Sequence, residues 1–154
     1  MHEIEIEYFL EGLEYIKNKF YIDAIEQFKK IIKEFPDSEL TDDAEYNICL
    51  CYYELNQFDS AITSLKKLIK DYPDATITVL GAGNEFGRTA AKSYLLMLNC
   101  YLALGKMAKS KEVLTVLEKY SDSYVLTDGE KVTYYNLGKK AISVYESILK
   151  MKEK

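Results

Sequence analysis

Apolar residues recur every three or four positions along most of the chain, a spacing that is typical of amphipathic helices. The pattern is clearest in two stretches, residues 21–38 and 58–75. When these stretches are superposed, their small, large apolar and proline positions coincide: Ala24 with Ala61, Phe28 with Leu65, and Pro36 with Pro73. The sequence therefore contains two copies of one helical unit, and an internal repeat of this kind indicates a repeat architecture.

The same periodicity predicts seven helices, over residues 3–18, 21–35, 42–55, 58–72, 91–104, 106–120 and 128–150. Proline pushes the preceding residue out of helical geometry, so Pro36 and Pro73 should end the second and fourth helices. Asp42 and Glu45 have the spacing of a capping box, which predicts the start of the third helix. Thr127 and Glu130 have the same spacing and predict the start of the last helix. With only two prolines and seven glycines, the chain reads as all-α.

The first two hairpins resemble the tetratricopeptide repeat, a helix-turn-helix of about 34 residues with the pattern W-x2-L-G-x2-Y, A-x3-F and P. In the first hairpin the pattern is carried by Tyr8, Gly12, Tyr15, Ala24, Phe28 and Pro36. In the second it is carried by Ile48, Cys49, Tyr52, Ala61, Leu65 and Pro73. Glu11 and Glu45 depart from it. A degenerate third copy is indicated by Tyr94, Tyr101 and Gly105.

The resemblance implies a single tetratricopeptide-like domain over residues 1–154, an α-solenoid of antiparallel helix pairs. We expect about three repeats and a C-terminal capping helix, with these approximate bounds: repeat 1, 5–38; repeat 2, 42–75; inserted loop, 76–90; repeat 3, 91–123; capping helix, 128–150. The Pro-Asp-Ser repeat end and the run DDAEYNICLCYYEL also resemble repeats of bacterial envelope-assembly lipoproteins and periplasmic division-associated proteins.

Charge and hydropathy narrow the classes of partner. The net charge is -5, and lysines are interleaved with glutamates, so neither a nucleic-acid nor an anionic membrane surface is expected. The longest apolar run, residues 94–104, is too short to cross a membrane. Three glutamates near the N-terminus do not fit a secretory signal. We expect a cytoplasmic protein, or a periplasmic one if a leader has been removed.

Few residues offer metal or catalytic chemistry. Cys49, Cys51 and Cys100 lack the paired spacing of zinc and redox sites, and His2 is the single histidine. We expect buried, reduced thiols, with no metal and no cofactor. The neighbours Asp42 and Asp43 lie at a helix start, where negative charge is favourable without any catalytic role. The chain is therefore expected not to be an enzyme.

The string GAGNEFGRT, which follows an apolar run, imitates a phosphate-binding loop. Compared with GxxxxGK[ST], Ala82 replaces the first glycine and Arg88 replaces the lysine. A nucleotide-binding regulator using residues 82–89 is thus a minor alternative. The alternative for residues 80–88 is an inserted loop that contacts a partner or folds over the groove.

In this family the first helix of each repeat lines a concave surface, so the resemblance implies a binding face for a protein or peptide. Carried over by position, its residues are Phe9, Leu13, Ile16, Tyr46, Asn47, Leu50, Tyr53, Lys92, Leu95, Asn99, Leu102, Tyr135 and Asn136. Some members clamp a terminal carboxylate there, but only Asn47 and Lys92 match the five clamp positions.

An apolar groove suits an extended or helical peptide, and the expected function is an interaction module or adaptor. As groove residues, Tyr46 and Tyr53 should tolerate alanine with little loss of stability. The alternative is a homo-oligomer in which the groove is filled by a second subunit or by the chain's own last helix.

Overall fold

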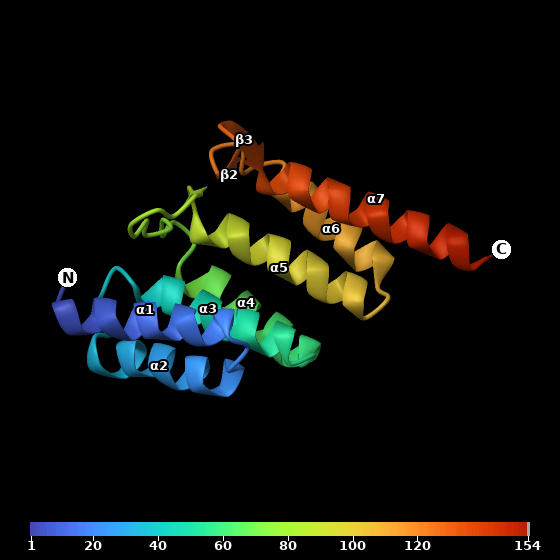
Figure 1. Cartoon of the computed structure of the whole chain (residues 1–154). Coiled ribbons are helices and arrows are strands. Elements are labelled where there is room, and N and C mark those ends of the chain that lie inside the picture. Colours follow the sequence, from blue (N-terminus) through green and yellow to red (C-terminus); the bar gives the residue numbers. More distant parts are fainter. Residues whose placement is uncertain (154) are drawn as a thin grey trace.

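Seven helices and a small antiparallel sheet make up the structure, a computed structural model that describes residues 1–153 (Figure 1). The helices are α1 Glu3–Lys17, α2 Tyr21–Glu34, α3 Thr41–Glu54, α4 Phe58–Asp71, α5 Thr89–Ala103, α6 Met107–Leu117 and α7 Tyr134–Lys152. The strands are β1 Glu85–Phe86, β2 Tyr124–Thr127 and β3 Glu130–Thr133, in the order β1-β2-β3.

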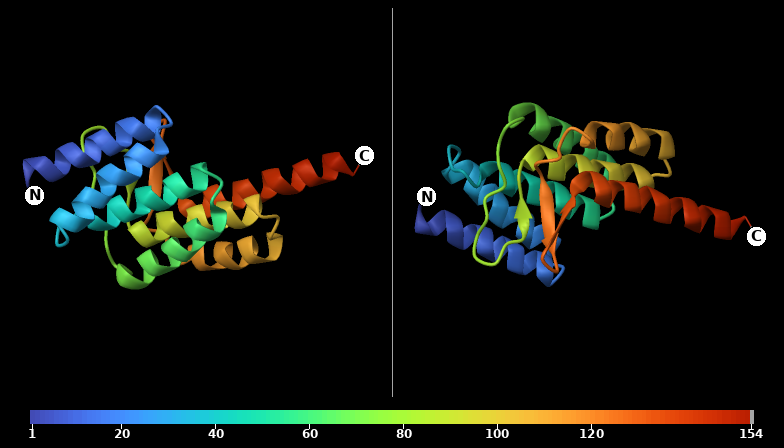
Figure 2. Two further views of the ribbon diagram at one scale, coloured as in Figure 1. Left: turned by 90° about the horizontal axis from the view of Figure 1, so that it is seen from below. Right: turned by 90° about the horizontal axis from the view of Figure 1, so that it is seen from above.

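The helices stack as consecutive hairpins (Figures 1 and 2). Helices α1 and α2, α3 and α4, and α5 and α6 form three pairs, α2 contacts α3, and α4 contacts α5. Helix α7 covers the end of the stack against α5 and α6. The predicted all-α solenoid with a terminal helix is confirmed, although the sheet was not predicted.

The turn inside each pair is the same motif three times. Its central residue has a positive φ: 64° at Lys19, 61° at Asn56 and 73° at Gly105. The following amide donates to a carbonyl five residues earlier, which belongs to a tyrosine in every case: Phe20 to Tyr15, Gln57 to Tyr52, and Lys106 to Tyr101. This is the Schellman arrangement, which satisfies the last carbonyls of a helix.

Close helix packing explains the small residue of the repeat pattern. A Cβ added to Gly12 on α1 would lie 2.5 Å from the ring of Phe28 on α2. Real Cβ atoms essentially never come so close to another atom, so a larger residue here would force the buried Phe28 ring to move.

Two apolar clusters form the core. The first, around Phe28, joins α1, α2 and α3, and the second, around Leu65, joins α3, α4, α5, α6 and α7. Tyr52 packs against both clusters. Helix α3 therefore couples the two halves of the stack.

The capping box predicted at Thr127 and Glu130 is wrong, because both residues belong to a β-hairpin. Asp128 and Gly129 have φ values of 51° and 79°, which fits a two-residue type I′ turn. The last helix begins later, where Thr133 is the N-cap and its hydroxyl accepts from the Asn136 amide at 3.1 Å. The predicted capping helix 128–150 becomes α7, Tyr134–Lys152.

The cap predicted at Asp42 is also wrong. Helix α3 begins at Thr41, with Leu40 as N-cap, and the Thr41 hydroxyl donates to the Phe35 carbonyl at 3.1 Å. Asp42 lies inside the first turn and its carboxylate accepts from the Thr89 hydroxyl on α5. The acidic residue is thus used between helices and not at the helix end.

Residues 76–88 form a loop whose two ends are joined, which we call the strap. Thr76 and Arg88 form an antiparallel bridge, the Ile77 amide donates to Gly87 O at 2.8 Å, and the Thr89 amide donates to Ala75 O at 3.0 Å. These bonds bring residue 89 next to residue 75, so α5 can pack against α4 as in an uninterrupted repeat.

Within residues 1–153, none of the helices has both the length and the apolar character needed to cross a membrane.

Candidate functional site

The first helices of the repeats line one concave face, and the strap covers half of it. Beneath the strap is a cavity of about 460 Å³, which we call the covered cavity. Its floor comes from α1, α3, α5 and α7, and its cover comes from the strap and β2 (Figure 2, right). The lining residues are Phe9, Leu13, Ile16, Asp43, Tyr46, Asn47, Leu50, Ile77, Thr78, Val79, Leu80, Gly83, Asn84, Glu85, Lys92, Leu95, Val125, Tyr134 and Leu137.

Polar bonds fix the first arm of the strap to the solenoid. The Thr78 amide donates to Asp43 Oδ1 at 3.2 Å, and the Thr78 hydroxyl donates to Glu39 O at 3.2 Å. Leu80 packs against the N-terminal apolar cluster. This arm therefore lies over the groove and forms one wall of the covered cavity.

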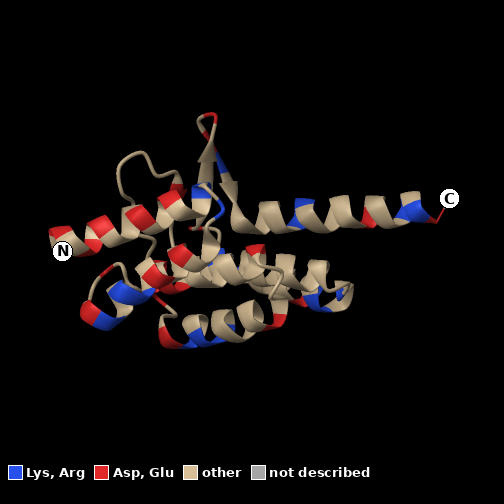
Figure 3. Cartoon of the chain, turned by 60° about the horizontal axis from the view of Figure 1, so that its bottom comes forward, with Lys and Arg blue, Asp and Glu red and all other residues tan. Residues whose placement is uncertain are grey.

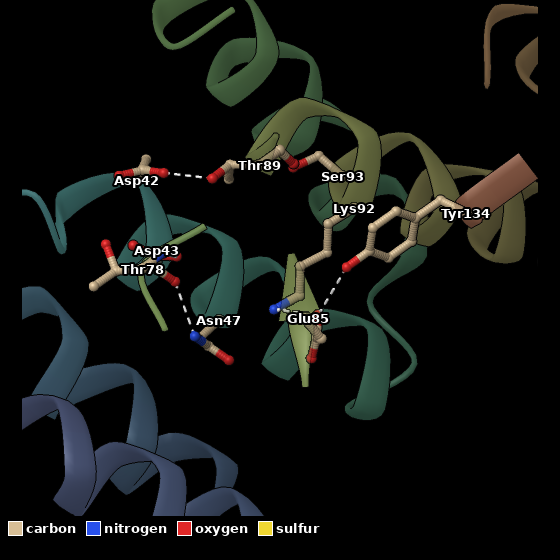
Figure 4. Close-up of polar contacts among 9 residues, drawn as sticks. All are labelled: Asp42, Asp43, Asn47, Thr78, Glu85, Thr89, Lys92, Ser93 and Tyr134. Atoms are coloured by element: carbon tan, nitrogen blue, oxygen red, sulfur yellow. Dashed lines mark hydrogen bonds and ion pairs between the residues drawn. The ribbon is translucent and has the colours of Figure 1, made fainter. Parts of the chain in front are cut away.

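The second arm of the strap is fixed to the hairpin and to α5. Strand β1 pairs with β2, and the Leu126 amide donates to Asn84 O at 2.8 Å. Glu85 Oε2 lies 2.8 Å from Lys92 Nζ and accepts from the Tyr134 hydroxyl at 3.2 Å (Figure 4). The strap is therefore an integral part of the fold.

Two adjacent buried carboxylates, Asp42 and Asp43, belong to the first turn of α3 (Figure 4), and Asp43 lines the covered cavity. Burial raises the pKa of Asp42, although the hydrogen bond from Thr89 opposes the shift. Burial, and then the neighbouring Asp42 charge, raise the pKa of Asp43 to about 7. Asp43 Oδ2 is buried and has no hydrogen-bond partner among the described residues. Both acids lie in the first turn of α3, as the sequence predicted, but their burial was not predicted.

The residues that imitated a phosphate-binding loop have structural roles. The Arg88 guanidinium lies 4.2 Å from the centre of the Tyr120 ring, and its Nε is 3.3 Å from Asp122 Oδ2, without hydrogen-bond alignment. The Arg88 amide donates to the Ser123 hydroxyl at 2.9 Å. The sheet beside the loop is antiparallel, whereas a phosphate-binding loop follows a parallel strand.

The remaining half of the concave face is an open groove of about 480 Å³ between α3, α5 and α7. Its lining is mainly apolar, with Lys140 at one side: Tyr53, Asn99, Leu102, Ala103, Leu137, Lys140, Ala141, Val144, Tyr145 and Ile148. Val144 and Ile148 are 50% and 44% exposed. Exposed apolar side chains that line a groove are typical of a binding surface.

Comparison with known proteins agrees with this geometry. Residues 43–75, which span α3 and α4, match a tetratricopeptide repeat family model. A stretch of 47 residues, 30% of the chain, is 40% identical to a chloroplastic protein of Arabidopsis thaliana. That stretch covers only 14% of the length of the curated relative.

Solved structures match nearly the whole chain. The yeast (Saccharomyces cerevisiae) Hsp90 co-chaperone Cns1 has a TM-score of 0.66 at 21% identity, over 99% of this chain and 42% of that one. The first tetratricopeptide domain of human RPAP3 has a TM-score of 0.63 at 15% identity, over 97% and 95%. The fold is a tetratricopeptide-repeat solenoid.

The Yersinia enterocolitica type III secretion translocator chaperone SycD also has this solenoid fold, with a TM-score of 0.64 at 12% identity over 100% of this chain and 97% of that one. These identities are low, so the likeness concerns the fold. The resemblance to bacterial envelope-assembly repeats finds no support in these comparisons.

The structure divides the predicted groove residues of the tetratricopeptide face between two sites. The covered cavity takes Phe9, Leu13, Ile16, Tyr46, Asn47, Leu50, Lys92 and Leu95. The open groove takes Tyr53, Asn99 and Leu102. Tyr135 packs partly against the core and Asn136 is exposed at the start of α7, so neither lines either site.

The sequence reasoning missed the α7 wall of the open groove. Leu137, Ala141, Val144 and Ile148 follow one another at helical spacing, and this apolar stripe could have been read from the sequence. The cover from β2 had no comparable signal, because it depends on pairing between distant segments.

Burial changes the expectation for Tyr46. This side chain is only 8% exposed and packs in the C-terminal cluster, so alanine there should cost stability as well as any binding. Tyr53 is half-buried, so for this residue we still expect alanine to cost little stability.

The three cysteines are buried as predicted, and burial raises the pKa of Cys49, Cys51 and Cys100 to about 12. At neutral pH these thiols are protonated and unreactive.

Proposed function

We propose that the protein is a non-catalytic interaction module that holds a peptide or a helix of a partner protein in the open groove. The observation that carries this proposal is the exposed apolar stripe of α7 facing α3 and α5 across the groove. The other half of the concave face is covered by the chain's own strap. The partner site is therefore the C-terminal half of the face.

The chemistry of the groove favours an amphipathic partner segment. Leu102, Leu137 and Val144 offer apolar contact, Tyr53 and Asn99 offer a few polar bonds, and Lys140 adds positive charge at one wall. A helix or extended strand with apolar anchors and an acidic flank suits these features. The structural relatives named above include a co-chaperone and a secretion chaperone, which fits an adaptor role.

The test compares two neighbouring substitutions on α7. Val144→Asp places a charge in the open groove, whereas Ser143→Asp places the same charge on the neighbouring side of the helix, away from the groove. Both positions are exposed, so both variants should keep the wild-type melting temperature. Each is used to capture proteins from the native cell.

We expect Val144→Asp to lose the proteins that the wild type and Ser143→Asp retain, by about tenfold or more, because a charge in an apolar contact is strongly unfavourable. If Val144→Asp captures the same proteins at the same yield, the open groove is not the partner site.

Self-association is a second candidate, favoured by the charges of the two end helices. Helix α1 has five glutamates and one lysine, whereas α7 has four lysines and one glutamate (Figure 3). Both also expose apolar side chains, including Ile4 and Met151. An end of one copy could thus bind the opposite end of the next. Light scattering decides: a mass of one chain at all concentrations excludes this candidate.

A further inference from the structure

The charges around the covered cavity do not balance. Asp43, Glu85 and Lys92 are the charged residues that line it, two acids and one base. Lys92 is already neutralised by Glu85 at 2.8 Å, and its ammonium lies 4.2 Å from the centre of the Tyr46 ring. The Asp43 carboxylate is left without a cation. The neighbouring Asp42 adds further negative charge.

One atom in particular lacks a partner. Asp43 is 5% exposed, its Oδ1 accepts from the Thr78 amide, and its Oδ2 has no donor within the part of the chain that the structure describes. Asn47 lies one turn further along α3 and donates its side-chain amide to the Asp43 carbonyl at 2.9 Å. The carbonyl oxygen of the Asn47 side chain is thus turned away from Asp43 (Figure 4), and Asn47 offers no donor to Oδ2.

Most of the rest of the cavity wall is apolar. Its main contributors are Phe9, Leu13, Ile16, Leu50, Leu95 and Leu137. A volume of about 460 Å³ lies within the range of small-ligand sites, which combine apolar walls with a few polar groups. The complement of this cavity is a hydrogen-bond donor with positive charge, attached to an apolar body.

We propose that the covered cavity binds a primary ammonium group carried on an unbranched apolar chain. The ammonium donates to the Asp43 carboxylate, and the apolar chain lies against Phe9, Leu50 and Leu95. An ammonium has three donors and no acceptor, which suits a buried carboxylate that lacks a donor. It also removes the free-energy cost of an unpaired buried carboxylate. The raised pKa of Asp43 is consistent with a carboxylate that lacks such a partner.

Two sources have this chemistry, a free alkylamine and the lysine side chain of a peptide. The inference goes beyond the proposed function, because the open groove and the covered cavity are lined by different residues apart from Leu137. Failure of the Val144 test and failure of the test below are therefore distinguishable.

The first experiment titrates the wild-type protein at pH 7.5 and follows backbone amide NMR signals. The first arm compares n-hexylammonium with 1-hexanol, which is equally long but neutral. The second arm compares capped Leu-Lys-Leu with capped Leu-norleucine-Leu, which lacks the ammonium group. We expect n-hexylammonium to bind with a dissociation constant of about 1 mM or below and about tenfold tighter than 1-hexanol. Signals of α3 and the strap should shift. Preference for the lysine peptide over the norleucine peptide identifies a peptide source; preference in the first arm alone identifies a free amine.

The second experiment removes the carboxylate. Asp43→Asn keeps the shape of the side chain and should reduce the preference for the ammonium to less than about twofold, whereas the exposed control Asp37→Asn should keep it. Leu13→Trp fills the cavity from a position that is 38% exposed, and should weaken both hexyl probes. This variant also decides the matter if Asp43→Asn does not fold. Equal binding of ammonium and alcohol by the wild type, or unchanged binding by Leu13→Trp, would overturn the proposal.

Discussion

Lys19, Asn56 and Gly105 occupy the same left-handed position in three equivalent turns. Glycine adopts this conformation without steric cost, asparagine tolerates it, and lysine pays about 1 kcal/mol or more. The first turn is thus the most strained of the three. The residue type at this position varies because the hydrogen bonds of the turn come from the backbone alone.

We predict that Lys19→Gly stabilises the protein by about 0.5–1 kcal/mol, because the steric cost at this position disappears. Asn56→Gly should have a smaller effect. Lys17→Gly, two residues earlier inside α1, should destabilise by about 0.5–1 kcal/mol, since glycine weakens a helix. Urea unfolding of the three variants measures the order, and a destabilised Lys19→Gly would contradict the assignment.

Asp43 gives a prediction for pH dependence. Its folded-state pKa of about 7 is above the ordinary value of an unfolded aspartate, near 4. Between these values the folded protein holds a proton that the unfolded chain releases, so the free energy of unfolding should fall as pH rises. The slope from this group is about 1.4 kcal/mol per pH unit near pH 5–6.

The measurement compares wild type with Asp43→Asn by urea unfolding between pH 5 and pH 8. The substitution removes the titrating group, so the variant should gain stability relative to the wild type as pH rises. Parallel pH profiles would show that Asp43 titrates normally.

At the scale of elements, the helices were predictable and the sheet was partly so. Periodicity and the two prolines located the helices because each helix buries its own apolar stripe. Asp128 and Gly129, between the alternating residues of 124–127 and 130–133, are a recognised hairpin signal, but Thr127 and Glu130 also have capping-box spacing. The hairpin signal is the correct one, and the capping-box prediction at Thr127 and Glu130 was wrong.

The strap could not be derived from the sequence in the same way. Its short strand β1 is specified by pairing with β2, and α5 and α6 lie between these two strands in the sequence. The only sequence signal for the strap was the length of the insertion. That length supported a loop that either contacts a partner or folds over the groove. Most of the concave residues were predictable because the repeat fixes which helix face they occupy. The α7 wall and the division of the face into a covered and an open half were not predicted.

Gly87 should be essential for docking the strap. Its φ is 107°, and an added Cβ would lie 2.5 Å from Ser123 Cα. We predict that Gly87→Ala lowers the free energy of unfolding by about 1–3 kcal/mol and accelerates amide exchange in β1. Gly81→Ala is the control within the strap: its φ is 58° but no other atom lies within 4 Å. It should cost about 1 kcal/mol and leave β1 protected; equal exchange in both variants would contradict the docking role.

At the scale of the whole molecule, the strap acts as a cover for an apolar face. Replacing residues 78–86 with Asn-Gly should close the paired ends at Ile77 and Gly87 with a two-residue turn. The solenoid should still fold, because the repeat helices are untouched. We predict a loss of about 2 kcal/mol, or about 4–8 °C in melting temperature, and stronger binding of an apolar fluorescent dye. Unchanged dye binding would show that the strap does not shield the face.

The pairing of β1 with β2 also sets an order of folding. A contact between segments separated by two helices carries a large loop-closure entropy, so it forms after the local hairpins α1–α2, α3–α4 and α5–α6. On a chain that emerges from its N-terminus, β1 has no partner strand until β2 has been made. The concave face of α1 and α3 is therefore complete before its cover from β2 can form, during the interval in which the second half of the protein is being synthesised.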